Sequence, residues 1–347
     1  MSTPEALTIP AGRVTDRLTA VLEEYRDEWQ KLDTLFGETI DLLSTLVLAG
    51  GKRVRPAMAC WGFVGAGGDA ADDSIVQLGA ALELLQAFAL FHDDVMDGSL
   101  TRRGEPTAHI RNIDAHQQNQ WSGEARRYGE SVAILAGDVS LVLSDVLLAD
   151  VNADVRRLWN ELRVEVNLGQ FLDVVGTARG NVPRATAERI VEYKTARYTI
   201  VRPLQMGAAL TGRNDLESSL ANIGTPLGVA FQLRDDLLGV FGETAATGKP
   251  VGDDLREGKP TPLLARAREA ANASQAEMLG WVGGELTDDQ VQAIQNILID
   301  TGAVADIEAQ ITELTNEALD NIARTPLAAN ASEMLTDIAR FLAARSS

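Results

Sequence analysis

Leu82-Glu83-Leu84-Leu85-Gln86-Ala87-Phe88-Ala89-Leu90-Phe91-His92-Asp93-Asp94-Val95-Met96-Asp97 is an apolar run that ends in three aspartates. The apolar residues predict a helix that is buried along most of its length. Asp93 and Asp97 are four residues apart, so they project from one face of that helix, with Asp94 close beside them. Three carboxylates this close repel one another unless a cation lies between them, and hard oxygen ligands suit Mg²⁺. The run therefore predicts a core helix that ends in a magnesium site.

A second acidic pair follows in Phe231-Gln232-Leu233-Arg234-Asp235-Asp236-Leu237-Leu238-Gly239, again at the end of an apolar helical stretch. The alternative for the first motif, an acidic helix end in solvent, opposes the helix dipole and leaves the apolar run unexplained. Two acidic helix ends in one helical chain indicate two metal-bearing walls of one cavity.

Composition favours packed helices. Of 347 residues, 45% are hydrophobic but only 5% are aromatic, so the core must be built from Leu, Ala, Val and Ile. No linker divides the chain, which predicts a single all-α domain over residues 1–347, with residues 1–14 as a loose N-terminal arm.

A formal net charge of −19 argues against a nucleic-acid partner. An acidic protein that binds phosphates must gather its few cations locally. They do lie in or beside the candidate motifs: Lys52, Arg53, Arg55, Arg102, Arg103, Lys194, Arg197, Lys249, Arg256 and Lys259.

The single cysteine, Cys60, cannot form an internal disulfide, which favours a reducing cytoplasm. The N-terminus lacks the pattern of a signal peptide. No transmembrane segment is expected, because the best candidate, Val132 to Val151, is interrupted by Asp138 and Asp145.

Three connecting segments carry further expectations. Gly50-Gly51 ends a helix and could bring cations close to an anion, although a plain turn between helices is an equal alternative. The polar stretch from Gly104 to Trp121 is expected to be irregular and could lie over the metal site. The Gly- and Pro-rich stretch from Phe241 to Pro260 is typical of a functional loop.

Together these motifs resemble a trans-type prenyl diphosphate synthase of the polyprenyl synthetase family, most closely a geranylgeranyl diphosphate synthase. The resemblance rests on the two aspartate motifs, on Gly50-Gly51-Lys52-Arg53-Val54-Arg55-Pro56 before them and on Lys194-Thr195 between them. It implies a large helical bundle around a central cavity, of the isoprenoid synthase type, in a homodimer. It also implies Mg²⁺-dependent condensation of isopentenyl diphosphate with dimethylallyl, geranyl or farnesyl diphosphate.

The resemblance also implies site residues and three Mg²⁺ ions per site. The metal ligands would be Asp93, Asp97 and Asp235, with Asp94 and Asp236 close by. Isopentenyl diphosphate would be held by Lys52, Arg55 and Arg103, and the allylic diphosphate by Arg102, Lys194, Lys249 and Lys259. Thr195 and Gln232 would offer oxygens to the carbocation, and the released pyrophosphate would take the proton.

Two positions depart from the family pattern. Most relatives carry histidine seven positions before the first aspartate, where this chain has Gln86. An amide can still donate to a phosphate, so we expect binding with an altered pH dependence. Gly239 replaces the last aspartate of the second motif, which weakens any partner for the loop lysines.

Product length should depend on the side chains that precede Asp93 on its helix, namely Phe88, Ala89 and Leu85. A large ring at Phe88 beside a small Ala89 is similar to geranylgeranyl diphosphate synthases. The alternative is that Phe88 belongs only to the core.

Other functions stay open from the sequence. The product could be farnesyl diphosphate or a longer chain. A terpene cyclase shares the fold and the first motif, but needs no second diphosphate site. A non-catalytic helical subunit that regulates a partner would tolerate both Gln86 and Gly239.

Overall fold

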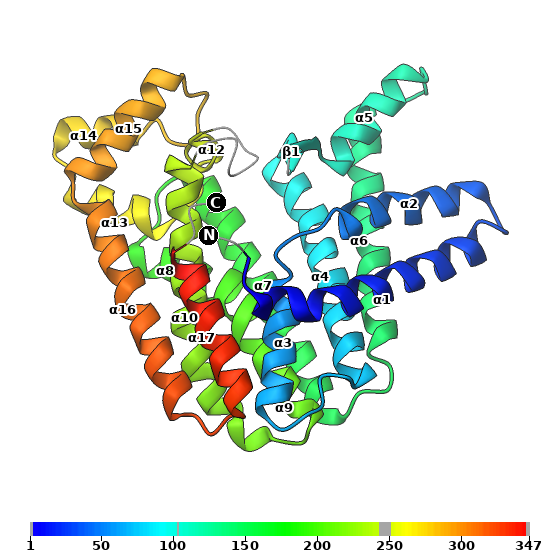
Figure 1. Cartoon of the computed structure of the whole chain (residues 1–347). Coiled ribbons are helices and arrows are strands. Elements are labelled where there is room, and N and C mark those ends of the chain that lie inside the picture. The colour runs from blue at the N-terminus through cyan, green and yellow to red at the C-terminus, as the bar shows by residue number, and fades with distance from the viewer. Residues whose placement is uncertain (1–2, 103, 243–250, 345–347) are drawn as a thin grey trace.

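The protein is almost entirely helical, which confirms the predicted all-α class (Figure 1). The computed structural model describes residues 3–102, 104–242 and 251–344. Its elements are α1 (Glu5–Trp29), α2 (Thr34–Leu48), α3 (Val54–Gly65), α4 (Asp73–Asp97), β1 (Thr101–Arg102), β2 (Glu105–Pro106), α5 (Ala108–Gln118), α6 (Ala125–Leu147), α7 (Ala153–Arg179), α8 (Arg184–Ile190), η1 (Val191–Val201), α9 (Arg202–Leu210), η2 (Asn214–Leu216), α10 (Glu217–Phe241), α12 (Asp253–Glu257), α13 (Pro262–Ala270), α14 (Ala273–Leu279), α15 (Asp288–Asp300), α16 (Ala303–Arg324) and α17 (Ala329–Ala344).

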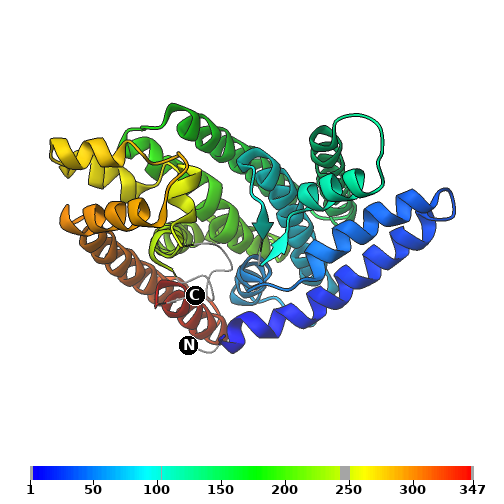
Figure 2. The ribbon, with the colours of Figure 1, turned by 90° about the horizontal axis from the view of Figure 1, so that it is seen from above.

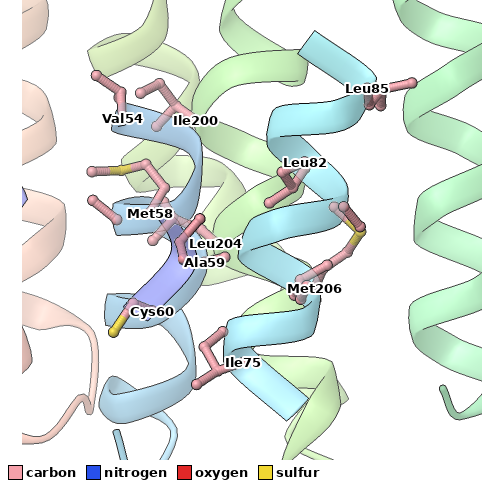
Figure 3. Close-up of a cluster of buried hydrophobic side chains, with 14 of the residues drawn as sticks. Val54, Met58, Ala59, Cys60, Ile75, Leu82, Leu85, Ile200, Leu204 and Met206 are labelled. Atoms are coloured by element: carbon pink, nitrogen blue, oxygen red, sulfur yellow. The ribbon is translucent and has the colours of Figure 1, made fainter. Parts of the chain in front are cut away.

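Helix α4 lies at the centre, packed against α1, α3, α6 and α9. Its buried side chains meet those of α3, η1 and α9 in the main core, as Leu82, Met58 and Leu204 do in Figure 3. Seen from above, α16 and α17 (orange to red) lie on one side and the α1–α2 hairpin (blue) on the other (Figure 2). A second core joins α10 to α12, α13, α15 and α16.

The ends of α4 are set by local chemistry. Asp72 caps its first turn by accepting a hydrogen bond from the backbone N–H of Ser74, and Gly98 ends it in the left-handed region with φ of 66°. Asp97 is therefore the last helical residue. Among the described residues, α4 is also the one helix long and apolar enough to cross a membrane by length and composition. However, 67% of that apolar window is buried inside the fold, as in the core helix of a globular protein.

The N-terminal segment corrects one expectation, because most of residues 1–14 is not a loose arm. Helix α1 begins at Glu5, and Ala6 and Leu7 are each only 1% exposed. Pro10 has no N–H to donate to the carbonyl of Ala6. The indole Nε1 of Trp61 on α3 donates to that carbonyl instead, at 2.6 Å, and ties the start of α1 to the core.

The segment from Gly104 to Trp121 was also expected to be irregular, and most of it is helical. Strands β1 and β2 form a short antiparallel pair, and α5 follows directly, packed against α6. His109 and His116 are buried in α5, which explains why its otherwise polar sequence forms an ordered helix.

Candidate active site

A cavity of about 630 Å³ brings the two acidic motifs together. Asp93 from α4 and Asp235 and Asp236 from α10 all line it. The segment before α3 contributes Lys52, and η1 contributes Lys194. The cavity therefore has acidic walls on two helices and basic groups between and beside them.

Asp93 faces Lys194 across the cavity. The ammonium of Lys194 donates to Asp93 at 3.1 Å and to Asp173 of α7 at 2.5 Å. Burial alone would lower the pKa of Lys194, but the carboxylates of Asp93 and Asp173 outweigh it and raise the pKa to about 12. Lys194 therefore stays charged at physiological pH and joins α4, α7 and η1.

Asp94 does not share this cavity, which corrects the expectation that it lies with the metal ligands. The next residue on a helix is turned by about 100°, and the Asp94 side chain faces a separate cavity of about 210 Å³. There it accepts hydrogen bonds from the guanidinium of Arg102, whose Nε lies 2.7 Å from Oδ1. Arg102 lines both cavities and lies 3.7 Å from Asp93, but its close partner is Asp94.

Lys194 and Thr195 lie on η1, a π-helical stretch inserted between α8 and α9. Wider helical turns of this kind occur often at functional sites. Two glycines let neighbouring helices reach this backbone. A Cβ at Gly169 of α7 would lie 2.4 Å from the amide nitrogen of Lys194, and one at Gly228 of α10 would lie 2.5 Å from the Cα of Ala196.

A chain of hydrogen bonds orients the second motif. Thr195 Oγ1 donates to Gln232 Oε1 at 2.7 Å, and Gln232 Nε2 donates to Asp236 Oδ1 at 2.7 Å. The other oxygen of Asp236 is buried and has no hydrogen-bond partner among the described residues. Burial raises the pKa of Asp236 to about 7, with a further contribution from the charge of Asp254.

The basic wall is built around Arg55 and Gln86. The guanidinium of Arg55 stacks over the ring of Tyr198, 4.2 Å from its centroid, and donates to Thr199 at 2.9 Å. Its Nε is buried without a hydrogen-bond partner among the described residues. The hydroxyl of Tyr198 donates to Gln86 Oε1 at 2.8 Å, so the amide nitrogen of Gln86 remains as a donor. Lys52 lines the same cavity.

Lys259 connects the first motif to the segment after α10. Its ammonium lies 2.6 Å from Glu257, 3.6 Å from Asp254 and 3.9 Å from Asp97. The Oδ2 of Asp97 is buried and has no hydrogen-bond partner within residues 3–102, 104–242 and 251–344. Burial and the charge of Asp93 raise the pKa of Asp97.

A smaller cavity of about 170 Å³ adjoins the main one. Phe88 and Ala89 line it, and the Phe88 ring packs against His92 at a centroid distance of 4.6 Å. Leu85 lines neither cavity. It is fully buried in the main core, which corrects its grouping with the other two (Figure 3). The two cavities share the lining residues Arg55, Gln86, Asp93, Lys194 and Thr195.

The predicted site residues Arg103 and Lys249 lie outside the described residues. The other predicted site residues either line the main cavity or lie outside its lining. Outside it, Asp94 lines the cavity of about 210 Å³, Phe88 and Ala89 line the one of about 170 Å³, and Asp97 and Leu85 line none of the three. Those that line the main cavity are Lys52, Arg55, Gln86, Asp93, Arg102, Lys194, Thr195, Gln232, Asp235, Asp236 and Lys259.

The carboxylates in and beside the main cavity fit a hard divalent cation. Asp97 and Asp236 each hold a buried oxygen that lacks a hydrogen-bond donor in the described part of the chain. No three His, Cys, Asp or Glu side chains of that part already form a metal-binding group. One or two carboxylates together with substrate phosphates are, however, the usual way in which proteins bind Mg²⁺.

Comparisons with known proteins identify the family of this chain. The family model described as polyprenyl synthetase matches residues 38–298. The chain belongs to the polyprenyl synthetase family. This membership confirms the resemblance and the prediction that the protein is an enzyme of the trans-prenyltransferase class.

Relatives within the polyprenyl synthetase family differ in product. A geranylfarnesyl diphosphate synthase of Aeropyrum pernix is 30% identical, with 85% of this chain and 88% of that protein covered. A geranylgeranyl diphosphate synthase of Methanosarcina mazei is 30% identical, with 81% of this chain and 83% of that protein covered. A crystal structure of geranylgeranyl pyrophosphate synthase from Corynebacterium glutamicum, complexed with isoprenyl diphosphate and magnesium, is 36% identical with a TM-score of 0.92. The match covers 99% of this chain and 100% of that one.

Several side chains in or beside the main cavity were not given roles from the sequence, among them Tyr198, Asp254 and Glu257. Tyr198 orients Arg55 and Gln86, and Asp254 and Glu257 surround Lys259. Tyr198 stands four residues after Lys194, and that helical spacing was an available signal. The two acidic residues lie in a Gly-rich segment whose path could not be predicted.

The buried carboxyl of Asp236 predicts a pH-dependent stability. Its folded-state pKa of about 7 exceeds the value of about 3.9 in an unfolded chain, so the folded protein holds a proton that the unfolded chain releases. Stability is therefore lost as pH rises toward 7. The Asp236→Asn variant has no such proton to lose. In EDTA, we therefore expect the free energy of unfolding of Asp236→Asn, relative to that of the unchanged protein, to rise by roughly 3 kcal/mol between pH 5 and pH 8. Urea unfolding at both pH values measures it, and an advantage that does not change with pH contradicts the assignment.

Proposed function

We propose that this protein is a Mg²⁺-dependent prenyltransferase that condenses isopentenyl diphosphate with allylic diphosphates to geranylgeranyl diphosphate. One observation carries the proposal. Asp93 and Asp235, from helix ends far apart in the sequence, line one cavity that also contains Lys194 and Arg55. Such a cavity can bind diphosphates and cations together, and it adjoins a smaller, more apolar cavity.

We assign the metal-holding role to Asp93, Asp97, Asp235 and Asp236. Mg²⁺, when bound, stabilises negative charge on a departing pyrophosphate, and the resemblance implies three ions. Asp94 is left out because Arg102 already neutralises it. The orphaned oxygens of Asp97 and Asp236 support the assignment, since a buried carboxylate without a donor is costly unless a cation reaches it.

The basic residues are assigned to the two diphosphates. Lys52, Arg55 and Gln86 hold isopentenyl diphosphate, because Arg55 and Gln86 keep N–H donors that no described residue accepts. Lys194 and Lys259 hold the allylic diphosphate. An ammonium has three N–H donors, and Lys194 directs two of them at Asp93 and Asp173, which leaves one for a phosphate oxygen.

The reaction separates charge within this cavity. The C–O bond of the allylic diphosphate breaks, and pyrophosphate leaves an allylic carbocation. The double bond of isopentenyl diphosphate then forms the new C–C bond, and the released pyrophosphate takes the proton that is lost. Thr195 donates its proton to Gln232, so the lone pairs of its oxygen can face the cation. Preorganised groups of this kind lower the barrier where charge develops.

Product length is assigned to Phe88 and Ala89, which line the smaller cavity next to Asp93. A growing hydrocarbon chain would leave the diphosphate site in that direction. The Phe88 ring, held against His92, would then stop elongation.

A homodimer is supported by two apolar stripes on the surface. On α6, Leu135 is 60% exposed and Val142 lies two turns further along. On α7, Phe171 is 63% exposed, one turn after Leu168. Asp145 joins the two helices through hydrogen bonds from Trp159 and Arg163. Exposed apolar faces of this kind mark interaction surfaces, and we assign this one to a second copy of the chain.

A cytoplasmic location is supported by Cys60, whose thiol is buried. Burial raises its pKa to about 11, so the thiol stays protonated and unreactive. Fractionation of cells that express the full chain tests this location, and recovery outside the cytoplasm contradicts it.

Incubation with substrates tests the activity. The full-length protein receives Mg²⁺, isopentenyl diphosphate and, separately, dimethylallyl, geranyl or farnesyl diphosphate, and the dephosphorylated products are separated by chromatography. We expect a 20-carbon alcohol. Asp235→Asn should lower kcat by at least about 100-fold, because it removes stabilisation of developing charge. The exposed Asp288→Asn is the matched control. A cyclic hydrocarbon product indicates a cyclase, and the absence of any product indicates a non-catalytic subunit.

Replacement of Phe88 tests the length determinant. Phe88→Ala opens the end of the smaller cavity, so we expect products longer by one or more isoprene units. Leu85→Met on the same helix is the control. It conserves volume in the core, lines neither cavity, and should leave the product unchanged. An unchanged product from Phe88→Ala removes Phe88 as the limit.

Sedimentation velocity tests the dimer. The full-length chain should sediment at twice the mass of one chain, and Phe171→Glu should shift it to the monomer, because a buried unpaired charge opposes association. Ile299→Glu on α15, which is 55% exposed away from the stripes, should leave the mass unchanged. A monomeric unchanged protein contradicts the assignment.

A further inference from the structure

The space beside Gly239 is already occupied by a carboxylate. Gly239 is on α10, four residues after Asp235, so the two positions share one face of the helix. A Cβ built at Gly239 would lie 1.9 Å from Oδ2 and 2.5 Å from Cγ of Asp254. The carboxyl of Asp254, on α12, therefore stands where an aspartate side chain at position 239 would begin.

Helix α12 is held in this place by its own contacts. Leu255 is fully buried in the core that also contains Leu237 and Val240 of α10. The carbonyl of Leu255 accepts a hydrogen bond from the N–H of Gly283 at 2.9 Å. The position of Asp254 against Gly239 is thus anchored on both sides.

Asp254 also meets the rest of the site. It lines the main cavity with Asp235, Asp236 and Gly239, and its Oδ1 lies 3.6 Å from the ammonium of Lys259. Asp236 beside it is only 4% exposed and keeps a buried oxygen without a hydrogen-bond partner among the described residues. A carboxylate at this point faces both a cation-binding wall and the lysine that spans the cavity.

We propose that Asp254 supplies, from α12, the third carboxylate of the second acidic motif, and that Gly239 makes room for it. Asp254 is then a further residue that positions the divalent cation and Lys259. This inference rests on the proposed function, because it concerns the same cation and diphosphate site. It differs from a plain loss of the third carboxylate, since the negative charge is kept and only its place in the sequence changes.

The test measures cation binding directly. Isothermal titration follows Mg²⁺ binding to the full-length protein in the presence of saturating inorganic pyrophosphate. Asp254→Asn removes the charge and keeps the shape, and we expect about a 10-fold to 100-fold loss of affinity. Asp288→Asn, whose carboxylate pairs with Arg256 of the same helix α12 from outside the cavity, should bind as the unchanged protein does.

A second experiment moves the carboxylate from position 254 to position 239. Gly239→Asp alone should weaken Mg²⁺ binding and lower Tm, because its side chain would overlap Asp254. The double variant Gly239→Asp with Asp254→Ala should bind Mg²⁺ with an affinity within about threefold of that of the unchanged protein. Residues in contact do not act additively, and here the new carboxylate fills the space that Asp254 leaves.

Two outcomes overturn the inference: Asp254→Asn that binds Mg²⁺ normally, or a double variant that binds no better than either single one. The Mg²⁺ affinity of Asp235→Asn distinguishes failure of this inference from failure of the proposed function. If Asp235→Asn also binds Mg²⁺ normally, the proposed cation site itself is wrong.

Discussion

Like charges gathered on facing helix ends are the constraint on which this structure depends. Asp236 is buried, and Asp93 and Asp97 are partly buried, in or beside one cavity. Carboxylates repel one another more strongly when burial takes them out of water. Lys194 and Lys259 offset part of that repulsion, and each contacts carboxylates from two different helices. The arrangement is therefore stabilised by cations, and it becomes more stable still when a further cation binds the folded state.

The fold keeps these charged groups in register by placing them on rigid elements. Helix α4 ends at Asp97 because Gly98 follows in the left-handed region, and α10 is packed along η1 and α16. The π-helical stretch η1 approaches α7 and α10 closely because Gly169 and Gly228 carry no side chain. Lys194 consequently reaches Asp93 and Asp173 from a backbone that has little freedom to move.

Features that depend on one helix could be predicted from the sequence, whereas those that depend on packing could not. The apolar run before Asp93 and the four-residue spacing to Asp97 are local, so the core helix and its acidic end followed directly. The pairing of Asp94 with Arg102 and the burial of Leu85 depend on which face of α4 meets which neighbour. Residues 5–14 were misjudged for the same reason, because the partner of the Ala6 carbonyl is Trp61, 55 residues away.

The two departures from the family pattern, Gln86 and Gly239, are each accompanied by a side chain from another helix. Gln86 cannot titrate as a histidine would. Burial raises the pKa of Tyr198 to about 12, so its hydroxyl keeps its proton at physiological pH and donates it to the amide oxygen of Gln86. The amide nitrogen of Gln86 therefore persists as an N–H donor at every working pH. Gly239 has no carboxylate, but that of Asp254 occupies the adjoining space. In both cases the proposed diphosphate site needs a hydrogen-bond donor or a charge at one position in the cavity. A residue from another helix can provide or orient that group. A motif that is incomplete along the chain is therefore compatible with a complete set of charges in the cavity.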